Sequence, residues 1–385
     1  MGLIGTGAGI TRREAIAVGA AAAAAPAIVH AAPAAMGLNA LAAAKGMRFG
    51  SAFAWSPPGA DAGSFANPAY ARLLRTDCGV LVAENELKWQ SVRPELKSFD
   101  FSRFDAMLDW ADAAHIPVRG HNLLWHREKW LPKWLNEHDF GSTPKVEAER
   151  LLTTHIQTVL RRYRGRIASY DVVNETVNDH DGTLEQTVLS KAYGSVEGLV
   201  DLAFHTARAE APQAQLVYND YMSWESGMEA HCAGVLRLLE GMKKRGVPVD
   251  ALGVQSHIIT QGAAGVGGMV AMQKRWRHFL DEVTGLGLTL LVTEFDVRDN
   301  NLPAAIGPRD QEVADYARAY LDVMFAYPQL RDVLAWGMTD RYSWIEGFEP
   351  RADGSHRRPC PYDDRFAPKP LHAAIAAAFE HAPTR

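Results

Sequence analysis

Eight apolar runs alternate along this chain with amphipathic segments, and this alternation constrains the fold more than any other feature. The runs cover residues 47–54, 78–83, 116–120, 167–175, 214–218, 251–254, 289–297 and 333–340. Helical periodicity marks residues 101–114, 144–163, 196–211, 228–245, 311–327 and 371–381. A strand–helix alternation repeated eight times predicts an α/β protein whose parallel strands close into a single (β/α)8 TIM barrel.

Polar and aromatic side chains gather where these runs end. Seven of the eight runs finish in a cluster drawn from Glu, Asn, Lys, His, Gln, Asp and Trp. A hydrophobic core has no use for so many polar groups, because each buried one needs a hydrogen-bonding partner. The C-terminal ends of parallel barrel strands share one rim, where such barrels keep their chemistry. We therefore expect a polar cleft, walled by tryptophans, at that rim.

Two of the runs carry a carboxylate at or near their end. Glu175 follows the run that begins at residue 167, and Glu294 lies in the run over 289–297. Taken alone, Glu175 also fits a strand followed by a capped helix, and either glutamate could serve in a salt bridge. Two glutamates delivered by two strand ends can instead face one another, which is the arrangement that glycoside hydrolysis requires.

The clusters together resemble glycoside hydrolase family 10, whose principal activity is endo-1,4-β-xylanase, over about residues 47–380. Six motifs stand in the family's order: Glu84–Trp89, His121–His126, Tyr170-Asp-Val-Val-Asn-Glu175, Gln255–His257, Thr293-Glu-Phe-Asp296 and Trp336–Trp344. The closing stretch from Tyr362 to Pro370 also resembles the family. Any one motif is weakly specific, but six in this order, each after an apolar run, are very specific.

The resemblance implies a retaining, double-displacement xylanase in which Glu175 is the general acid and then the base. Glu294 is then the nucleophile that forms a glycosyl-enzyme intermediate. Glu294 has to be ionised when the substrate arrives, whereas Glu175 has to be protonated. Two close carboxylates favour this division because the charge on one raises the pKa of the other.

The resemblance also implies a set of residues that bind the sugar around the scissile bond. They are Glu84, Asn85, Lys88, His121, Trp125, Asn174, Gln255, His257, Trp336 and Trp344, with Asp171 and Asp296 as carboxylates that orient them. By spacing alone each tryptophan could pack in the core, His257 could be a core histidine, and Lys88 could be a solvated charge.

Three stretches depart from the family pattern. Tyr170 replaces a usual Trp, which we expect to alter packing only. Arg127 and Glu128 follow His126 where Ser-Gln is common, and Met222 replaces an Asn after Asn219-Asp220-Tyr221. The change at Arg127 and Glu128 bears on the contacts on that side of the scissile bond, and Met222 weakens the expected role of its loop in binding the leaving-group sugar.

Composition and spacing bound the cofactors and partners. The spacing of His, Cys, Asp and Glu predicts no metal, and no Gly-rich motif predicts a nucleotide cofactor. A formal net charge of -5 does not indicate nucleic acid or an anionic membrane as a partner. The three cysteines, Cys78, Cys232 and Cys360, allow one disulfide at most, and we expect buried thiols. We expect a monomer that binds xylan or xylo-oligosaccharides.

The N-terminal residues resemble an export signal. Arg12 and Arg13 precede an Ala-rich apolar run over residues 15–29, and small residues follow to residue 35. This pattern predicts a cleaved twin-arginine signal over 1–35, a linker over 36–45 and a barrel over 46–385, in a periplasmic or secreted protein. The alternative is an Ala-rich helix of the mature protein.

Two other functions remain open at this point. A barrel hydrolase of another β-1,4-glycan, of the cellulase or aryl glycosidase type, differs in the room left for the hydroxymethyl group that glucose carries and xylose lacks. We expect Trp344 and its loop to decide that clearance. A non-catalytic glycan-binding barrel would usually have lost one carboxylate, and this chain keeps both Glu175 and Glu294.

Overall fold

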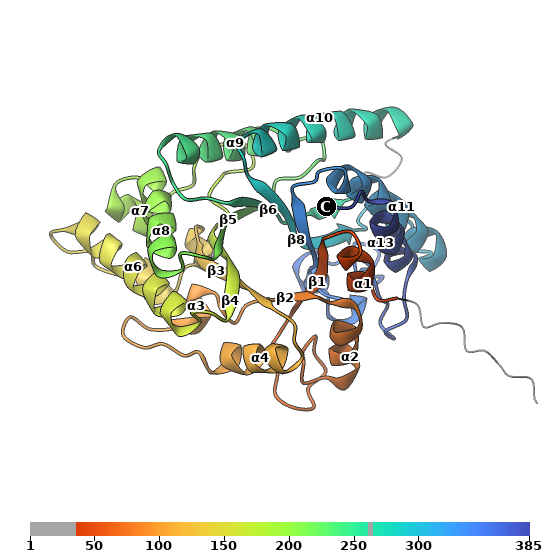
Figure 1. Cartoon of the computed structure of the whole chain (residues 1–385), viewed down its shortest axis with the longest axis horizontal. Coiled ribbons are helices and arrows are strands. Elements are labelled where there is room, and N and C mark those ends of the chain that lie inside the picture. Colours follow the sequence, from red (N-terminus) through yellow and green to blue (C-terminus); the bar gives the residue numbers. More distant parts are fainter. Residues whose placement is uncertain (1–35, 261–264) are drawn as a thin grey trace, which may run out of the picture. The chain divides into compact units, whose positions relative to one another are not determined.

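Eight parallel strands form a closed ring in the computed structural model of this chain, which describes residues 36–260 and 265–385 (Figure 1). The strands of the ring are β1 Arg48–Phe53, β2 Val80–Ala83, β3 Val118–Trp125, β4 Ile167–Asn174, β5 Gln215–Asp220, β6 Ala251–Val254, β8 Thr289–Arg298 and β9 Leu330–Ala335. Each strand pairs with its neighbours in the ring, and pairing of Ala251 with Thr289 joins β6 to β8. A short strand, β7 His257–Ile259, adds to the C-terminal half of β8.

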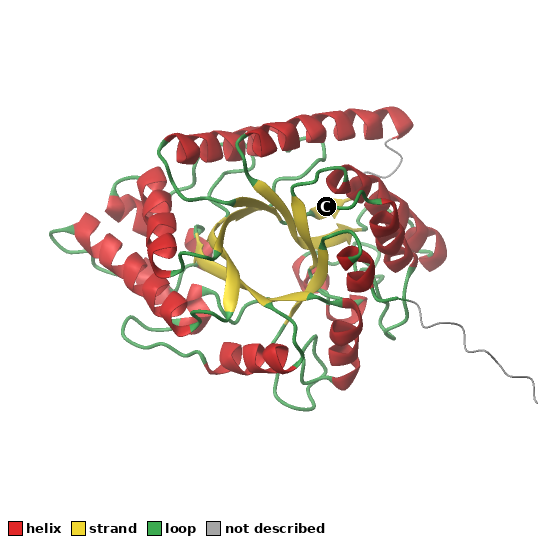
Figure 2. Ribbon diagram, in the orientation of Figure 1, coloured by secondary structure: helices red, strands yellow, loops and turns green. Residues whose placement is uncertain are grey.

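Helices surround the ring of strands, as Figure 2 shows. The longer ones are α2 Pro68–Asp77, α4 Ser102–Ala113, α6 Pro144–Arg162, α8 Val196–Glu210, α9 Glu229–Lys244, α10 Gly265–Gly285, α11 Ile306–Phe325 and α13 Pro370–His381. Shorter elements are α1 Leu38–Ala43, α3 Trp89–Val92, η1 Glu128–Trp130, α5 Lys133–Asn136, α7 Val188–Tyr193, η2 Asp340–Tyr342 and α12 Trp344–Phe348. The predicted (β/α)8 barrel is confirmed. No helix among the described residues is both long and apolar enough to cross a lipid bilayer.

Side chains of the chain itself begin several of these helices. Asn67 accepts the backbone N–H groups of Ala69 and Tyr70 at the start of α2, and Pro68 follows it as the first helical residue. Thr187 and Ser190 form a reciprocal capping box on α7. Such caps satisfy backbone donors that the first turn of a helix leaves unpaired, so they fix where each helix begins.

The stretch 36–45, which we expected to be a linker, contains helix α1 and belongs to the same unit as the barrel, which extends over Met36–Arg385. Leu38 and Ala42 are fully buried, and the Leu38 N–H donates to Asp77 Oδ1 at 3.0 Å. These contacts order the stretch because α1 covers apolar side chains of β1 and α13. The predicted export signal over residues 1–35 lies outside the described residues.

Two strands differ in extent from the prediction. β3 continues to Trp125, so His121 and Trp125 lie on the strand and not after it. β9 begins at Leu330, earlier than expected, and ends at Ala335, just before Trp336. The polar composition of 121–126 hid the strand, although the pairing of His121 with Asp171 and of Trp125 with Asn174 continues the ladder between β3 and β4.

Candidate functional site

The C-terminal ends of the barrel strands carry every residue that the sequence singled out. Glu84, Asn85 and Lys88 follow β2; His121 and Trp125 lie on β3; Asp171 and Asn174 lie on β4, with Glu175 next; Gln255 follows β6 and His257 lies on β7; Glu294 and Asp296 lie on β8; and Trp336 and Trp344 follow β9. Hydrogen bonds, ion pairs and ring contacts join most of these residues into one connected group at that end of the barrel.

Glu175 begins the loop after β4 in a strained backbone conformation. Its φ of 55° falls in the left-handed region, which non-glycine residues rarely adopt. Its N–H donates to Asn219 O at 3.0 Å, and its Oε1 accepts from Asn174 Nδ2 at 3.0 Å and Gln255 Nε2 at 2.9 Å. Strain of this kind persists where the surroundings over-determine a residue's position, as they do here.

Glu294 lies on β8 and is buried, with 5% of its surface exposed. Its Oε1 accepts from Asn219 Nδ2 at 2.8 Å, and its Oε2 lies 3.3 Å from His257 Nε2. Asn219 Nδ2 also donates to Asn174 Oδ1 at 2.8 Å, and the Thr293 hydroxyl donates to Asn219 Oδ1 at 2.7 Å. Asn219 on β5 therefore connects Glu294 to the amide that contacts Glu175.

His257 lies between two carboxylates of β8. Its Nδ1 is 2.9 Å from Asp296 Oδ2, and the Trp344 indole N–H donates to the same oxygen at 2.8 Å. Burial opposes a charge on the imidazole, but Asp296 and Glu294 outweigh burial and raise the pKa of His257 to about 9. At neutral pH His257 is therefore a cation that stabilises the ionised form of Glu294.

The surroundings shift the two glutamates in opposite directions. Burial raises the pKa of Glu175, and the charges of Asp220 and Glu294 raise it further against the hydrogen bond from Gln255. Burial also acts on Glu294, but the hydrogen bond from His257 and the charges of His257, His121 and Lys88 lower its pKa below the ordinary value. Environments that separate the pKa values of a carboxyl pair assign one group as acid and the other as anion.

His121 and Lys88 complete the polar group. The His121 Nδ1 lies 2.9 Å from Asp171 Oδ2, and because a carboxylate only accepts, Nδ1 carries a proton. Burial raises the pKa of Asp171, but Arg119, bound to Asp171 Oδ1 at 2.5 Å, and His121 together lower it. Lys88 Nζ donates to Asn85 Oδ1 at 3.0 Å, and burial lowers the pKa of Lys88.

Three tryptophans lie against these polar groups. The Trp336 ring is 5.4 Å from the His121 ring, and the Trp344 ring is 5.0 Å from the His257 ring. Lys88 Nζ lies 4.5 Å from the Trp125 ring centre, and Trp130 stacks on Trp125 at 4.6 Å. Trp125 and Trp344 are partly exposed, so they are available to a ligand as well as to their neighbours.

The three departures from the family pattern have different structural consequences. Tyr170 is buried on β4 and lies over Gly120 of β3, where an added Cβ would come within 2.2 Å of its ring. Met222 is fully buried and offers nothing to solvent. Arg127 lies beside Glu175, with its Nε 3.9 Å from Glu175 Oε2.

No role for Asn219 or Asp220 was predicted from the sequence, although both stand in the polar cluster after the fifth run. Asn219 pairs with Glu294, and the charge of Asp220 raises the pKa of Glu175. Both effects depend on side-chain direction, which a polar cluster alone does not specify. Arg119 was also missed, because an arginine inside a strand carries no signal of its ion pair with Asp171.

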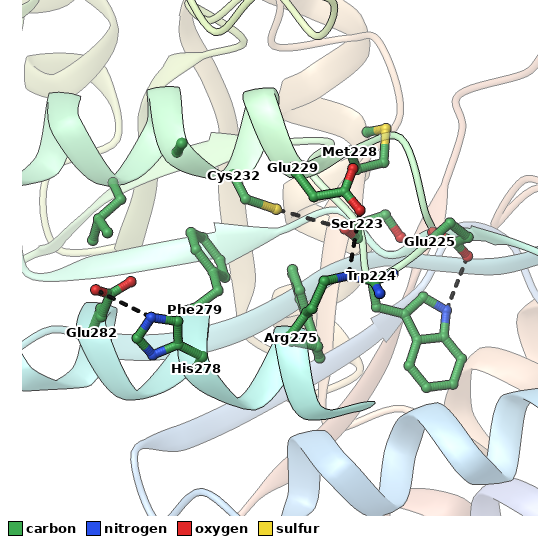
Figure 3. Close-up of a pocket in the computed structure, with 13 residues that line it drawn as sticks. Ser223, Trp224, Glu225, Met228, Glu229, Cys232, Arg275, His278, Phe279 and Glu282 are labelled. Atoms are coloured by element: carbon green, nitrogen blue, oxygen red, sulfur yellow. Dashed lines mark hydrogen bonds and ion pairs between the residues drawn. The ribbon is translucent and has the colours of Figure 1, made fainter. Parts of the chain in front are cut away.

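No group of three or more His, Cys, Asp or Glu within 36–260 and 265–385 is arranged to hold a metal ion. The three cysteines are free thiols, with Cys78 and Cys360 buried. A cavity of about 240 Å³ lies where α9, α10 and the loop after β5 meet (Figure 3), and its lining includes Trp224, Met228 and Phe279. None of the predicted site residues lines this cavity, so it is separate from the carboxyl pair.

Comparisons with known proteins agree with this geometry. The model of the family described as glycosyl hydrolase family 10 matches residues 37–378. The chain is 28% identical to endo-1,4-beta-xylanase B of Thermotoga neapolitana over 326 residues, 85% of this chain and 86% of the relative. It is 31% identical to endo-1,4-beta-xylanase 2 of Aureobasidium pullulans over 306 residues, 78% and 80% of the two chains.

Solved structures that resemble this fold are also xylanases. The native xylanase 10B of Thermotoga maritima superposes with a TM-score of 0.78 at 29% identity, over 89% of this chain and 98% of that one. Xylanase 10B of Thermotoga petrophila, solved in complex with xylobiose, also gives 0.78 at 29% identity, over 89% and 97% of the two chains.

Proposed function

Because this chain belongs to glycosyl hydrolase family 10, we propose that it is a retaining endo-1,4-β-xylanase that cleaves internal bonds of xylan. One observation carries the proposal. Glu175 and Glu294 lie at the same end of the barrel, connected through Asn174 and Asn219, with a raised pKa on Glu175 and a lowered pKa on Glu294. The xylanase relatives and the xylobiose-bound neighbour support xylan as the substrate.

The proposed reaction proceeds in two displacements. In the first, Glu294 attacks the anomeric carbon while Glu175 gives its proton to the departing glycosidic oxygen. The bond to that oxygen breaks, and a glycosyl ester forms on Glu294. In the second, ionised Glu175 takes a proton from water, the water oxygen attacks the anomeric carbon, and the ester bond to Glu294 breaks. Two inversions leave the product with the configuration of the substrate.

The neighbouring residues fit supporting roles in this scheme. The His257 cation and Asn219 hold the Glu294 carboxylate ionised and in one orientation. In this proposal Asn174 binds the 2-hydroxyl of the sugar being cleaved. Lys88 and His121 bind other hydroxyls of the same sugar, and Gln255 lines the same subsite. Glu84 and Asn85 bind the next sugar, and burial and Glu86 raise the pKa of Glu84 to about 7.

The tryptophans support the choice of a pentose over a hexose. Trp344 is fixed by its bond to Asp296 and by its contact with His257, so its ring cannot easily turn aside. A fixed ring beside the sugar's fifth carbon would penalise the hydroxymethyl group of glucose. Specificity for xylose would then come from a clash with glucose as well as from favourable contacts with xylose.

Relative rates on two polymers test the proposed substrate. We expect hydrolysis of β-1,4-xylan to exceed that of carboxymethylcellulose by a wide margin, measured as reducing ends released per mole of enzyme. A Trp344→Ala variant should narrow the margin by accepting glucose units better. Equal rates of the unmodified enzyme on the two polymers would overturn the xylanase proposal and leave family membership intact.

We also propose that the enzyme is exported through a twin-arginine signal over residues 1–35 and acts as a monomer outside the cytoplasm. Arg12 and Arg13 ahead of the Ala-rich run support the export signal. Polymeric xylan is too large to enter a cell, so an endo-acting enzyme has to meet it outside.

A further inference from the structure

Arg127 brings a positive charge close to the proposed general acid. Its Nε lies 3.9 Å from Glu175 Oε2, and only 18% of the Arg127 side chain is exposed. A partly buried cation at this distance favours the ionised form of a carboxyl, which a general acid cannot use. Arg127 therefore acts against the role of Glu175 unless another charge offsets it.

Glu185 supplies an opposing charge. Its Oε1 lies 2.9 Å from Arg127 Nη1, on the side of the guanidinium away from Nε. The chain between Glu175 and Glu185 forms a hairpin in which Val177 pairs with Leu184, and the Glu185 N–H donates to Thr176 O at 2.8 Å. Asn178 Nδ2 also donates to Glu185 Oε1 at 2.6 Å. The carboxylate of Glu185 is thus held against Arg127 by its own hairpin.

The guanidinium of Arg127 has little capacity left for a ligand. Its Nη2 donates to Val177 O at 2.7 Å and to the Tyr221 hydroxyl at 2.9 Å, while Nη1 faces Glu185. An arginine has five N–H donors, and most of these are used within the protein. Arg127 is therefore a fixed charge beside Glu175 and a brace for Tyr221, not a free binding site for an anionic substituent.

Other charges also face Glu175, one from each neighbouring strand end. Asp220 on β5 and Glu294 on β8 are negative and favour its protonated form. Lys88 after β2 is positive and interacts with both Glu175 and Glu294. Arg127 after β3 is the second cation, and Gln255 after β6 is neutral. Asp220, Arg127 and Glu185 lie outside the six family motifs quoted above, and Glu185 is the carboxylate that contacts the guanidinium of Arg127.

We propose that Glu185 is a positioning residue that, by neutralising Arg127, sets the pH at which Glu175 loses its proton. This inference rests on the proposed role of Glu175 as general acid. The Arg127–Glu185 pair adds a cation and an anion with little net charge, so Glu175 stays protonated to a higher pH than it would beside Arg127 alone.

A Glu185→Gln variant tests the inference because Gln keeps the size of Glu and can still accept from Asn178. We expect the basic limb of the kcat/KM profile on xylan, which reports free-enzyme ionisations, to move down by roughly 0.5 to 1 pH unit. Arg127→Gln should move the same limb up. Glu137→Gln, which removes an equally charged but exposed side chain directly after α5, should leave the limb in place.

An activated substrate separates this inference from the assignment of Glu175. A dinitrophenyl xylobioside needs no proton on its leaving group, so Glu185→Gln should not move the basic limb for that substrate. If the basic limb of Glu185→Gln on xylan lies at the same pH as that of Glu137→Gln, or at a higher pH, the inference is overturned. Glu175 would still keep its role as general acid. If Glu175→Ala retains xylan hydrolysis and its basic limb, the role of Glu175 fails first.

Discussion

Glu175 and Glu294 carry the same functional group, and their neighbours push the two pKa values apart. The sequence predicted the pair and the mutual effect of two close charges. The structure adds burial as the largest cause for Glu175, and the cation of His257 as the main support of the Glu294 anion. Such neighbours come from different strands, so their effect depends on side-chain directions that no local pattern fixes.

The charge on His257 predicts a pH-dependent contribution to stability. Its pKa of about 9 in the folded protein lies above the ordinary value of 6.5, so the contribution is fully present below pH 6.5 and is lost as the pH rises through 9. The difference in unfolding free energy between the unmodified protein and His257→Asn should therefore shrink between pH 6 and 9.5, by up to about 3 kcal/mol. Denaturant titrations across this range measure the difference, and a difference that stays constant would show that folding does not raise the pKa of His257.

At the level of elements, Gly253 on β6 leaves room for a side chain of the neighbouring strand β5. A Cβ added there would lie 2.3 Å from Asn219 Oδ1 and 3.1 Å from Thr293 Cγ2. Gly253 thus leaves the space in which Asn219 turns toward Glu294. The sequence placed the strand over 251–254 but could not show that one of its residues positions an amide on the strand beside it.

Gly253→Ala should therefore lower activity through Asn219. Losing a hydrogen bond to a charged group costs about 1.5–3 kcal/mol, which corresponds to a fall in kcat/KM of roughly 10- to 150-fold. Asn219→Ala should give a similar fall, and the double variant should be far from additive because both act on one bond. Gly285→Ala, at the end of α10 with no atom within 4 Å of its Cβ, is the matched control. Full activity of Gly253→Ala would contradict this account.

The sequence also defined most elements well and a few poorly. Strongly apolar runs such as 167–175 and 289–297 correspond to β4 and β8, because burial on both faces leaves a continuous signal. Helix α1 was missed, since a short Ala-rich helix at the barrel's end is stabilised by tertiary contacts of Leu38 and Ala42 more than by its own periodicity. The second half of β3 was missed because its polar residues interrupt the apolar run, although they continue the strand.

For the whole molecule, the barrel brings together residues from Glu84 to Trp344 that are far apart in the chain. Eight strands of one direction put all their C-terminal ends on one rim, so membership of the site followed from the alternation and the motifs. The hydrogen bonds and ion pairs between the site residues could not be predicted from the alternation or the motifs. Arg127 and Glu185, for example, lie 58 positions apart, and their ion pair depends on the hairpin after β4.

The proposed export is tested on the chain that includes residues 1–35. Changing Arg12 and Arg13 together to lysine should leave the precursor in the cytoplasm, because twin-arginine export depends on the arginine pair. Fractionation and activity assays of the culture measure the distribution, and the unmodified chain in the same host is the control. Normal export of the double variant would show that another signal is used.

Azide rescue tests most directly whether Glu175 is the acid/base and Glu294 the nucleophile. Glu175→Ala should lose xylan hydrolysis by on the order of 10²–10⁴, yet still form the glycosyl-enzyme from a dinitrophenyl xylobioside, whose leaving group needs no proton. The intermediate should then accumulate, because its breakdown lacks a base. Azide needs no base, so added azide should restore turnover and yield a β-glycosyl azide.

Glu294→Ala should show neither the accumulated intermediate nor the β-azide, because it lacks the nucleophile. The product's anomeric configuration, determined by proton NMR, together with the rate in azide is the decisive measurement. Equal behaviour of the two variants on the activated substrate, or an α-azide from Glu175→Ala, would contradict the assignment of acid/base and nucleophile.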